Sequence, residues 1–227
     1  MKELFASIFQ TVTVGDYLLN ILSTLLLTSI GTLVAYFIGF PLGILLYGTA
    51  EERMFYNKPV NKIVGTLVNI IRSVPFIILL VMTQPIAKLA VGTKIGDKAY
   101  VFYLIIASVP FVARMIEASL SEVDRNIVEA AQSMGASNFK IITKVLIPEA
   151  KPSLLLGAAI AFVTVLGYTP MSYLIAGTGL GSLAIQYGLY RFDSTVMYIS
   201  SILLIILVQI MQDSFAYLAR KTDKRKK

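Results

Sequence analysis

The stretch EAAQSMGA at residues 129–136, with LIP following at residues 146–148, lies in the longest polar interval between two strongly apolar segments. Its apolar residues recur at the helical spacing i, i+3, i+4 and i+7: Ile127, Ala130, Ala131 and Met134. Gly135 can adopt the left-handed conformation of a turn, and Ser137 can cap a second helix that ends at Pro148. The apolar stripe of that second helix is Phe139, Ile142 and Leu146. The pattern predicts a short helix–turn–helix hairpin whose small side chains let another backbone approach closely.

The order of residues in this interval resembles the coupling motif of permease subunits of binding-protein-dependent ABC importers. The matching positions are Glu129, Ala130, Ala131, Gly135, Ala136, Leu146 and Pro148. Ile147 stands where the motif usually has leucine. In that family the hairpin sits in a cleft of a separate cytoplasmic ATPase, so the resemblance implies such a partner here. The residues alone leave open an interfacial amphipathic hairpin without a partner.

The composition is that of an integral membrane protein. The 227 residues are 56% hydrophobic, and the mean hydropathy of +0.76 exceeds what a soluble core requires. The net charge of +7 does not indicate nucleic acid, because six basic residues stand together after an apolar segment: Arg220, Lys221, Lys224, Arg225, Lys226 and Lys227. A basic tail in that place is typical of a cytoplasmic anchor beside anionic lipid.

Several kinds of chemistry are excluded. Cysteine and histidine are both absent, which rules out disulfides, zinc sites, thiol nucleophiles and histidine bases. No pair of carboxylates is placed for metal binding or acid–base work, and no nucleophile stands with a base, so we expect a transporter subunit rather than an enzyme. No G-x-x-x-x-G-K-[ST] motif occurs, so ATP and Mg would be bound by a partner ATPase and this chain would bind no cofactor.

Five apolar segments are long enough to cross a bilayer as helices. They cover about 17–47, 63–85, 100–120, 153–176 and 195–217. We therefore expect an all-α integral membrane protein, with a single transmembrane permease domain over residues 1–227 and coupling helices at about 124–147. A ridge of small residues, Gly31, Ala35, Gly39 and Gly43, is expected to pack inside one subunit. We expect the glycine-rich segment 177–181 to be a flexible loop.

Five crossings place the two termini on opposite sides of the membrane. One side holds the basic tail and seven further basic residues outside the spans: Arg53, Lys58, Lys62, Arg125, Lys140, Lys144 and Lys151. The other side holds five: Lys2, Lys88, Lys94, Lys98 and Arg191. The positive-inside rule predicts a cytoplasmic C-terminus and hairpin and an external N-terminus.

Three charged residues fall within the predicted spans. Arg72 is costly in lipid, so we expect it to face protein, water or a carboxylate. Arg114 and Glu117 stand at i, i+3 and can neutralise each other. A substrate or proton path through them is the alternative.

Four other runs narrow the resemblance to methionine-importer permeases: RSVPFIILL at 72–80, PFVARM at 110–115, LGY at 166–168 with Met171, and QYG at 186–188. The similarity extends from the first span to the fifth. It implies a homodimeric permease of the bacterial inner membrane that forms the path for methionine. Its implied partners are the ABC ATPase subunits, an extracytoplasmic substrate-binding protein and a second copy of the chain.

Tyr168 and Met171 are candidates for the translocation gate, because Gly167 and Pro170 weaken the helix that carries them. Ordinary packing is the alternative for each. Two other functions stay open: a permease for another small amino acid, and a stand-alone channel or ion-coupled carrier. The last would leave the coupling motif without a purpose.

Overall fold

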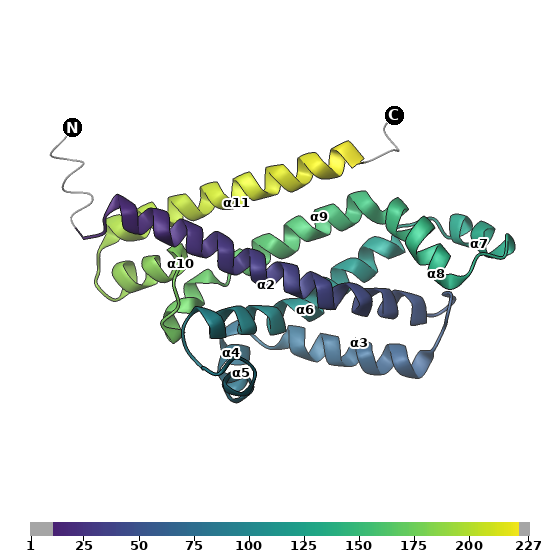
Figure 1. Ribbon diagram of the computed structural model, residues 1–227, viewed down its shortest axis with the longest axis horizontal. Helices are drawn as coiled ribbons and strands as arrows, with labels where there is room; N and C mark the ends of the chain where they lie inside the picture. The colour runs from purple at the N-terminus through teal and green to yellow at the C-terminus, as the bar shows by residue number, and fades with distance from the viewer. Residues whose placement is uncertain (1–10, 223–227) are drawn as a thin grey trace. The chain divides into compact units, whose positions relative to one another are not determined.

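The computed structural model describes residues 11–222 (Figure 1). The start of the N-terminal lead-in and the tail residues Lys224 to Lys227, which carry part of the charge asymmetry, lie outside the described residues. Within the described part every regular element is a helix. The elements are α2 (Val14–Thr49), α3 (Lys58–Ser73), α4 (Phe76–Met82), α5 (Gln84–Val91), α6 (Asp97–Ser121), α7 (Arg125–Ser133), α8 (Asn138–Ile141), η1 (Ile142–Leu146), α9 (Ile147–Leu166), η2 (Thr169–Ile175), α10 (Leu180–Leu183), η3 (Ala184–Leu189) and α11 (Ser194–Thr222).

The predicted all-α membrane fold is confirmed. In residues 11–222, four helical stretches are long and apolar enough to cross a membrane: Val14–Thr49, Asp97–Ser121, Asn138–Ile175 and Ser194–Thr222. The pair α3 and α4 becomes a fifth if both parts form one broken span. These helices start earlier than the sequence indicates, and α11 continues past the expected end because Arg220 and Lys221 favour the last turn of a helix.

The second predicted span is not a straight helix. Helices α3 and α4 meet at an angle of 105°. Pro75 lacks a backbone N–H, and the residue before a proline is disfavoured in the helical region. Val74 accordingly adopts an extended conformation, with φ −82° and ψ 124°. The predicted span 63–85 therefore covers the end of α3, all of α4 and the first two residues of α5.

Packing divides the chain into two compact units. One unit comprises residues up to 34, 75–106 and 162–211, and the other comprises 35–74, 107–161 and residues from 212 on. The four long helices α2, α6, α9 and α11 each contribute to both units. A single permease domain over residues 1–227 stays a prediction.

The core of the second unit forms where α2 packs on α6. A Cβ atom on Gly43 would lie 2.7 Å from the carbonyl oxygen of Ala113, so only glycine allows this approach. Gly39 makes a similar contact with Val112 and Val109. The small-residue ridge therefore packs within the chain, as expected for these two positions. Buried residues of α7, α8 and α9 complete this core.

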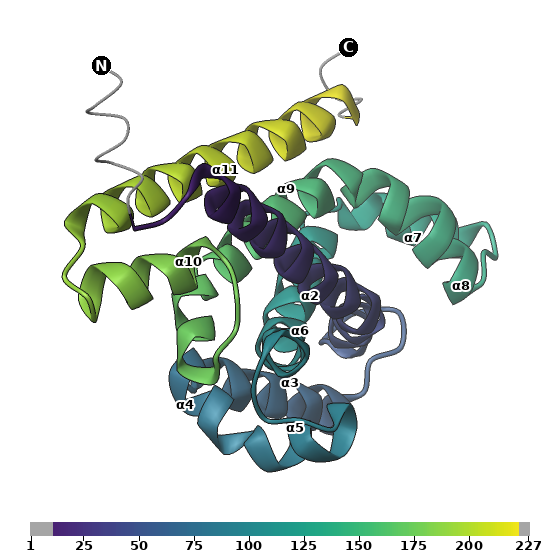
Figure 2. The ribbon, with the colours of Figure 1, turned by 60° about the vertical axis from the view of Figure 1, so that its left-hand side comes forward.

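The first unit contains the helix breaks α4–α5 and η2–α10 (Figure 2). Its core includes Tyr17, Leu180, Leu183 and Val196. The expectation of a flexible loop at 177–181 is wrong. Side chains of α2 and α6 accept hydrogen bonds from its backbone, and acceptors so far away in the sequence left no local signal.

Candidate functional site

The hairpin predicted around EAAQSMGA is present as α7, α8 and η1, and lies in the second unit (Figure 1). The carboxylate of Asp124 accepts from the N–H of Asn126 at 2.9 Å and caps α7. Gly135 has φ +74°, and no atom lies within 4 Å of the place where its Cβ would be. Glycine is therefore favoured at this turn for its conformation and not for space. Behind it, the N–H of Ala136 donates to the carbonyl of Ala131 at 3.1 Å.

The apolar face predicted for α7 is wrong by one residue. Val128 and Ala131 are the buried positions of α7, and of the predicted set only Ala131 is buried. One residue turns a helix by about 100°, so this shift changes which side chains face outward. Ile127, Met134 and Phe139 are exposed, the last two by 81% and 76%. We call these three residues, together with the exposed Ala130, the hairpin surface.

The second arm of the hairpin does not end at Pro148. Helix α8 passes into the π-helix η1 and then directly into α9, in which Pro148 is the second residue. Proline is tolerated in the first turn of a helix, and the wider π turn lets the N–H of Ile147 donate to Ile142. Ser137 occupies the N-cap of α8, but its side chain makes no capping bond. Ile141 and Leu146 are buried, whereas Phe139 of the predicted stripe is not.

Arg125 braces the first arm of the hairpin. Its guanidinium donates to Glu129 at 2.9 Å and to Glu52, in the connection between α2 and α3, at 2.5 Å. The hydrogen bond and charge of Arg125 lower the pKa of Glu52. The spacing i, i+4 predicts the first pair. Glu52 lies 73 residues before Arg125, so the sequence gives no signal for the second.

Of the matched coupling positions, Glu129 and Ala130 are exposed on α7, and Gly135 is exposed in the turn. Ala136 is half-buried behind them. Ala131 and Leu146 are buried in the core of the second unit. The motif therefore combines outward-facing residues with residues that hold the hairpin to the rest of its unit. Their role in coupling stays a prediction.

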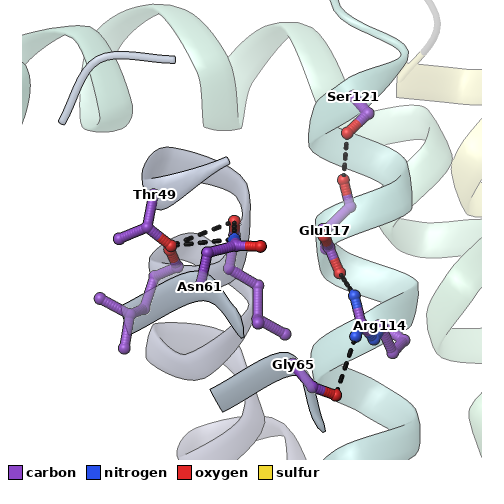
Figure 3. Close-up of polar contacts among 8 residues, drawn as sticks. Thr49, Asn61, Gly65, Arg114, Glu117 and Ser121 are labelled. Carbon is purple, nitrogen blue, oxygen red and sulfur yellow. Dashed lines mark hydrogen bonds and ion pairs between the residues drawn. The ribbon is translucent and has the colours of Figure 1, made fainter. Parts of the chain in front are cut away.

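Two of the charged residues of the predicted spans, Arg114 and Glu117, are paired within the second unit (Figure 3). Nη1 of Arg114 lies 2.6 Å from the carboxylate of Glu117, and Nη2 donates to the carbonyl of Gly65 at 3.1 Å. The two side chains are only 26% and 21% exposed, so this neutralisation lowers the cost of partial burial. Asn61 makes a similar polar link, donating to Leu46 and Thr49.

Arg72 does not lie in the middle of an apolar helix. It occupies the last turn of α3, where a cation interacts favourably with the helix dipole, and it is exposed. Its guanidinium lies over the ring of Phe111, 5.8 Å from the centroid. The expectation that Arg72 faces protein is met by this ring and not by a carboxylate.

The two gate candidates lie at the break after α9, in the first unit. Tyr168 is the N-cap residue of the 3₁₀-helix η2, and Met171 is in its first turn. Both side chains are half-buried. The ring of Tyr168 stacks on Phe76, the first residue of α4. The break itself was predicted, but Phe76 as a partner was not, and the role of the pair as a gate stays a prediction.

Residues 11–222 contain no group of three or more acidic, histidine or cysteine side chains that could hold a metal ion.

Comparison with known proteins identifies the family. The family described as "Binding-protein-dependent transport system inner membrane component" matches residues 39–223. This chain belongs to that family. The matched region of this chain contains the whole hairpin and both gate candidates.

Individual relatives of this chain carry names that include methionine. The chain is 46% identical over 202 residues to the probable D-methionine transport system permease protein MetI of Vibrio cholerae, covering 89% of this chain and 90% of the relative. It is 38% identical over 181 residues to the methionine import system permease protein MetP of Bacillus subtilis, covering 80% and 82%. A chain of the MetNI methionine ABC transporter, solved in an inward-facing conformation, superposes with a TM-score of 0.91 at 36% identity, over 93% of this chain and 98% of that one.

Proposed function

We propose that this chain is the permease subunit of an ATP-driven importer of methionine, in which it forms the translocation path. The observation that carries the proposal is the likeness to MetI of Vibrio cholerae, at 46% identity over 89% of the chain. The family match over residues 39–223 extends through α3, α6, α9 and α11 and is not confined to the hairpin. The substrate named for the relatives is therefore the first one to test.

In this proposal the hairpin surface docks in a cleft of a separate ABC ATPase. Support comes from Met134 and Phe139, which are among the most exposed large apolar side chains of the described residues. Apolar residues gathered on an exposed hairpin favour a protein partner. ATP and Mg are bound by that partner, and this chain binds no cofactor.

A second copy of the chain completes the path. Only 11% of the apolar stretch of α11 is buried within one copy, compared with 50% for α6. A two-fold pair would place one path at the interface of two equal subunits. An extracytoplasmic substrate-binding protein would deliver methionine to the outer face.

The proposed topology places the N-terminus outside and the C-terminus in the cytoplasm. Arg53, Arg125, Lys140 and Lys144 support it, because they lie on the hairpin or on the connection braced to it. Basic residues concentrate on the cytoplasmic side of membrane proteins. The same topology gives the ATPase access to the hairpin.

The mechanism is alternating access. Closure of two ATPases around ATP would move the hairpins, and the motion would pass into α9, because α8, η1 and α9 follow one another without a break. Rearrangement of the helices would then open the path outward, and hydrolysis would reset it. Specificity would reside mainly in the binding protein.

The test is reconstitution in liposomes with the cognate ATPase and binding protein. Uptake of labelled methionine should require ATP, the binding protein and the permease, and should stop with an ATPase variant that cannot hydrolyse ATP. Uptake of another small amino acid in place of methionine would contradict the substrate. Uptake of methionine without the ATPase would indicate a channel or ion-coupled carrier.

A further inference from the structure

The segment between η2 and α10 is held at every backbone N–H from residue 177 to residue 180. The four groups donate to four acceptors: Gly177 to the carbonyl of Ser172 at 2.8 Å, Thr178 to Oδ1 of Asp97 at 2.7 Å, Gly179 to Oδ1 of Asn20 at 2.9 Å and Leu180 to Oγ1 of Thr24 at 2.9 Å. Three of these acceptors are side chains of α2 and α6. We call Asn20, Thr24 and Asp97 the clamp.

Asp97 makes two hydrogen bonds from α6 to this segment. Its second carboxylate oxygen accepts from the hydroxyl of Thr178 at 2.8 Å. The preceding residue, Gly96, donates its N–H to the carbonyl of Ile175 at 2.6 Å. The start of α6 therefore holds both the end of η2 and the segment that follows it. Hydrogen bonds to an ionised carboxylate are stronger than those between neutral groups.

The clamped segment, η2 and α10 form one block within the first unit. The hydroxyl of Ser182 donates to the carbonyl of Gly177 at 2.8 Å. A Cβ atom on Gly181 would lie 2.5 Å from the backbone nitrogen of Pro170, so α10 lies directly on η2. Met171 is part of η2. Holding the segment in place therefore fixes the position of Met171.

The two sides of the clamp differ in burial. Thr24 and Leu180 are 1% and 0% exposed, so opening their bond would leave a buried N–H without a partner. Asp97 is half-buried, and its bonds to Thr178 are exposed to solvent. Water can replace those bonds at much lower cost. The Asp97 side is the one that can open and close.

We infer that Asp97 is a positioning residue of the transport cycle: by holding Thr178 it keeps the η2–α10 block, and with it Met171, in the arrangement that this structure shows, and the block is released when Asp97 and Thr178 separate. The inference rests on the proposed function, because it assigns a task within that cycle. It adds a residue outside the coupling motif and outside the gate candidates.

The first experiment measures opening directly and uses no substrate. The chain has no cysteine, so Ile175→Cys introduces a single thiol at a position that is 2% exposed, at the end of η2. Its rate of modification by a maleimide is measured in the purified permease–ATPase complex without nucleotide. Adding Asp97→Ala should raise that rate by about tenfold, the ratio for roughly 1.4 kcal/mol. Asp97→Asn, which keeps one acceptor, should give an intermediate rise.

The matched control is Thr93→Val in the same connection. Within residues 11–222, the hydroxyl of Thr93 bonds only to the backbone of Ile95, in its own loop. This variant should leave the labelling rate unchanged. An equal rate in the Asp97→Ala and parent proteins would overturn the inference, and so would an equal rise in the control. If Asp97→Ala aggregates on gel filtration, Asp97→Asn and Thr178→Val carry the same comparison.

The second experiment uses reconstituted liposomes. Asp97→Ala should raise ATP turnover without the binding protein by about threefold to tenfold and lower the methionine transported per ATP. If the wild-type complex transports no methionine while Asp97→Ala still raises labelling, the proposed function fails and the positioning role stands. If methionine is transported while labelling and turnover do not change, only the positioning role fails.

Discussion

The ring of Phe76 stacks on the ring of Tyr168, with the centroids 4.4 Å apart and the planes 12° from parallel. Phe76 begins α4 directly after Pro75, and Tyr168 stands at the break between α9 and η2. The contact therefore joins two places in the first unit where a helix breaks next to a proline. It gives the predicted gate a partner that can be tested.

Replacing Phe76 by leucine should loosen the gate. The variant keeps an apolar side chain but loses the stacked pair, which contributes about 1 kcal/mol beyond burial. ATP turnover without the binding protein should rise by about fivefold in proteoliposomes. Phe76→Tyr retains a ring and should stay near wild type. Equal ATP turnover in the leucine and tyrosine variants would show that the stacked rings play no part in gating.

Met171→Ala should weaken the coupling between transport and hydrolysis. The truncation leaves space beside η2, and Met171→Leu, which nearly conserves volume, should not. The measurement is ATP turnover with and without the binding protein, together with methionine uptake. Unchanged basal turnover and unchanged uptake in the alanine variant would count against a gate at this position.

Changes in the hairpin should weaken ATPase binding while the permease stays inserted and dimeric. Glu129→Lys reverses a charge in the docking region, and Gly135→Leu places a side chain at φ +74°, where leucine is strained. The measurement is the yield of ATPase that co-purifies with the tagged permease.

Two controls separate docking from folding of the hairpin. Glu129→Gln removes the charge without repelling Arg125, and Gly135→Asn tolerates the left-handed conformation. Both should retain most of the ATPase, and so should Glu51→Lys, an exposed acid outside the hairpin. Wild-type yield in the Glu129→Lys and Gly135→Leu variants would refute docking through these residues.

Glu117→Ala should destabilise the permease by about 1–3 kcal/mol, because it leaves the partly buried guanidinium of Arg114 without its carboxylate. The thermal unfolding midpoint in detergent measures the loss. The double variant Arg114→Met/Glu117→Ala should recover part of it, since no unpaired charge remains. Equal stability of Glu117→Ala and wild type would show that water replaces the ion pair without cost.

The brace of Arg125 should respond to acid. The guanidinium lowers the pKa of Glu52 from its ordinary value of 4.5. A group whose pKa is lower in the folded state contributes stability above its unfolded pKa, and that contribution is lost as the pH falls through the folded value. The brace should therefore be intact from neutral pH down to about 4.5 and weaken below it. In ¹³C NMR the Glu52 carboxylate should titrate below 4.5, and Arg125→Gln should move its midpoint upward.

The sequence predicts the existence of the hairpin better than its outward face. Periodicity identifies α7, and the left-handed turn follows from Gly135. The choice between Ile127 and Val128 as the buried residue depends on what α7 packs against, and the local pattern is compatible with either. The pattern alone therefore assigns the exposed residues Ile127 and Met134 to the buried face.

The polar contacts that determine the site are mostly long-range. Asn20 and Thr24 accept hydrogen bonds from N–H groups that lie 159 and 156 residues away in the sequence. Glycines at 177, 179 and 181 are typical of a mobile loop, and the distant acceptors hold this one together with local bonds to Ser172 and Ser182. The pair Arg114–Glu117, at three residues apart, is local and could be predicted.

The π turn before Pro148 has a mechanical consequence. If the second arm ended at Pro148, a flexible connection would separate Phe139 from α9. Movement of Phe139 would then not be transmitted to α9. The widened turn keeps the backbone helical from Asn138 to Leu166, so, if an ATPase docks on the hairpin as proposed, a displacement of Phe139 would pass along one uninterrupted helical stretch.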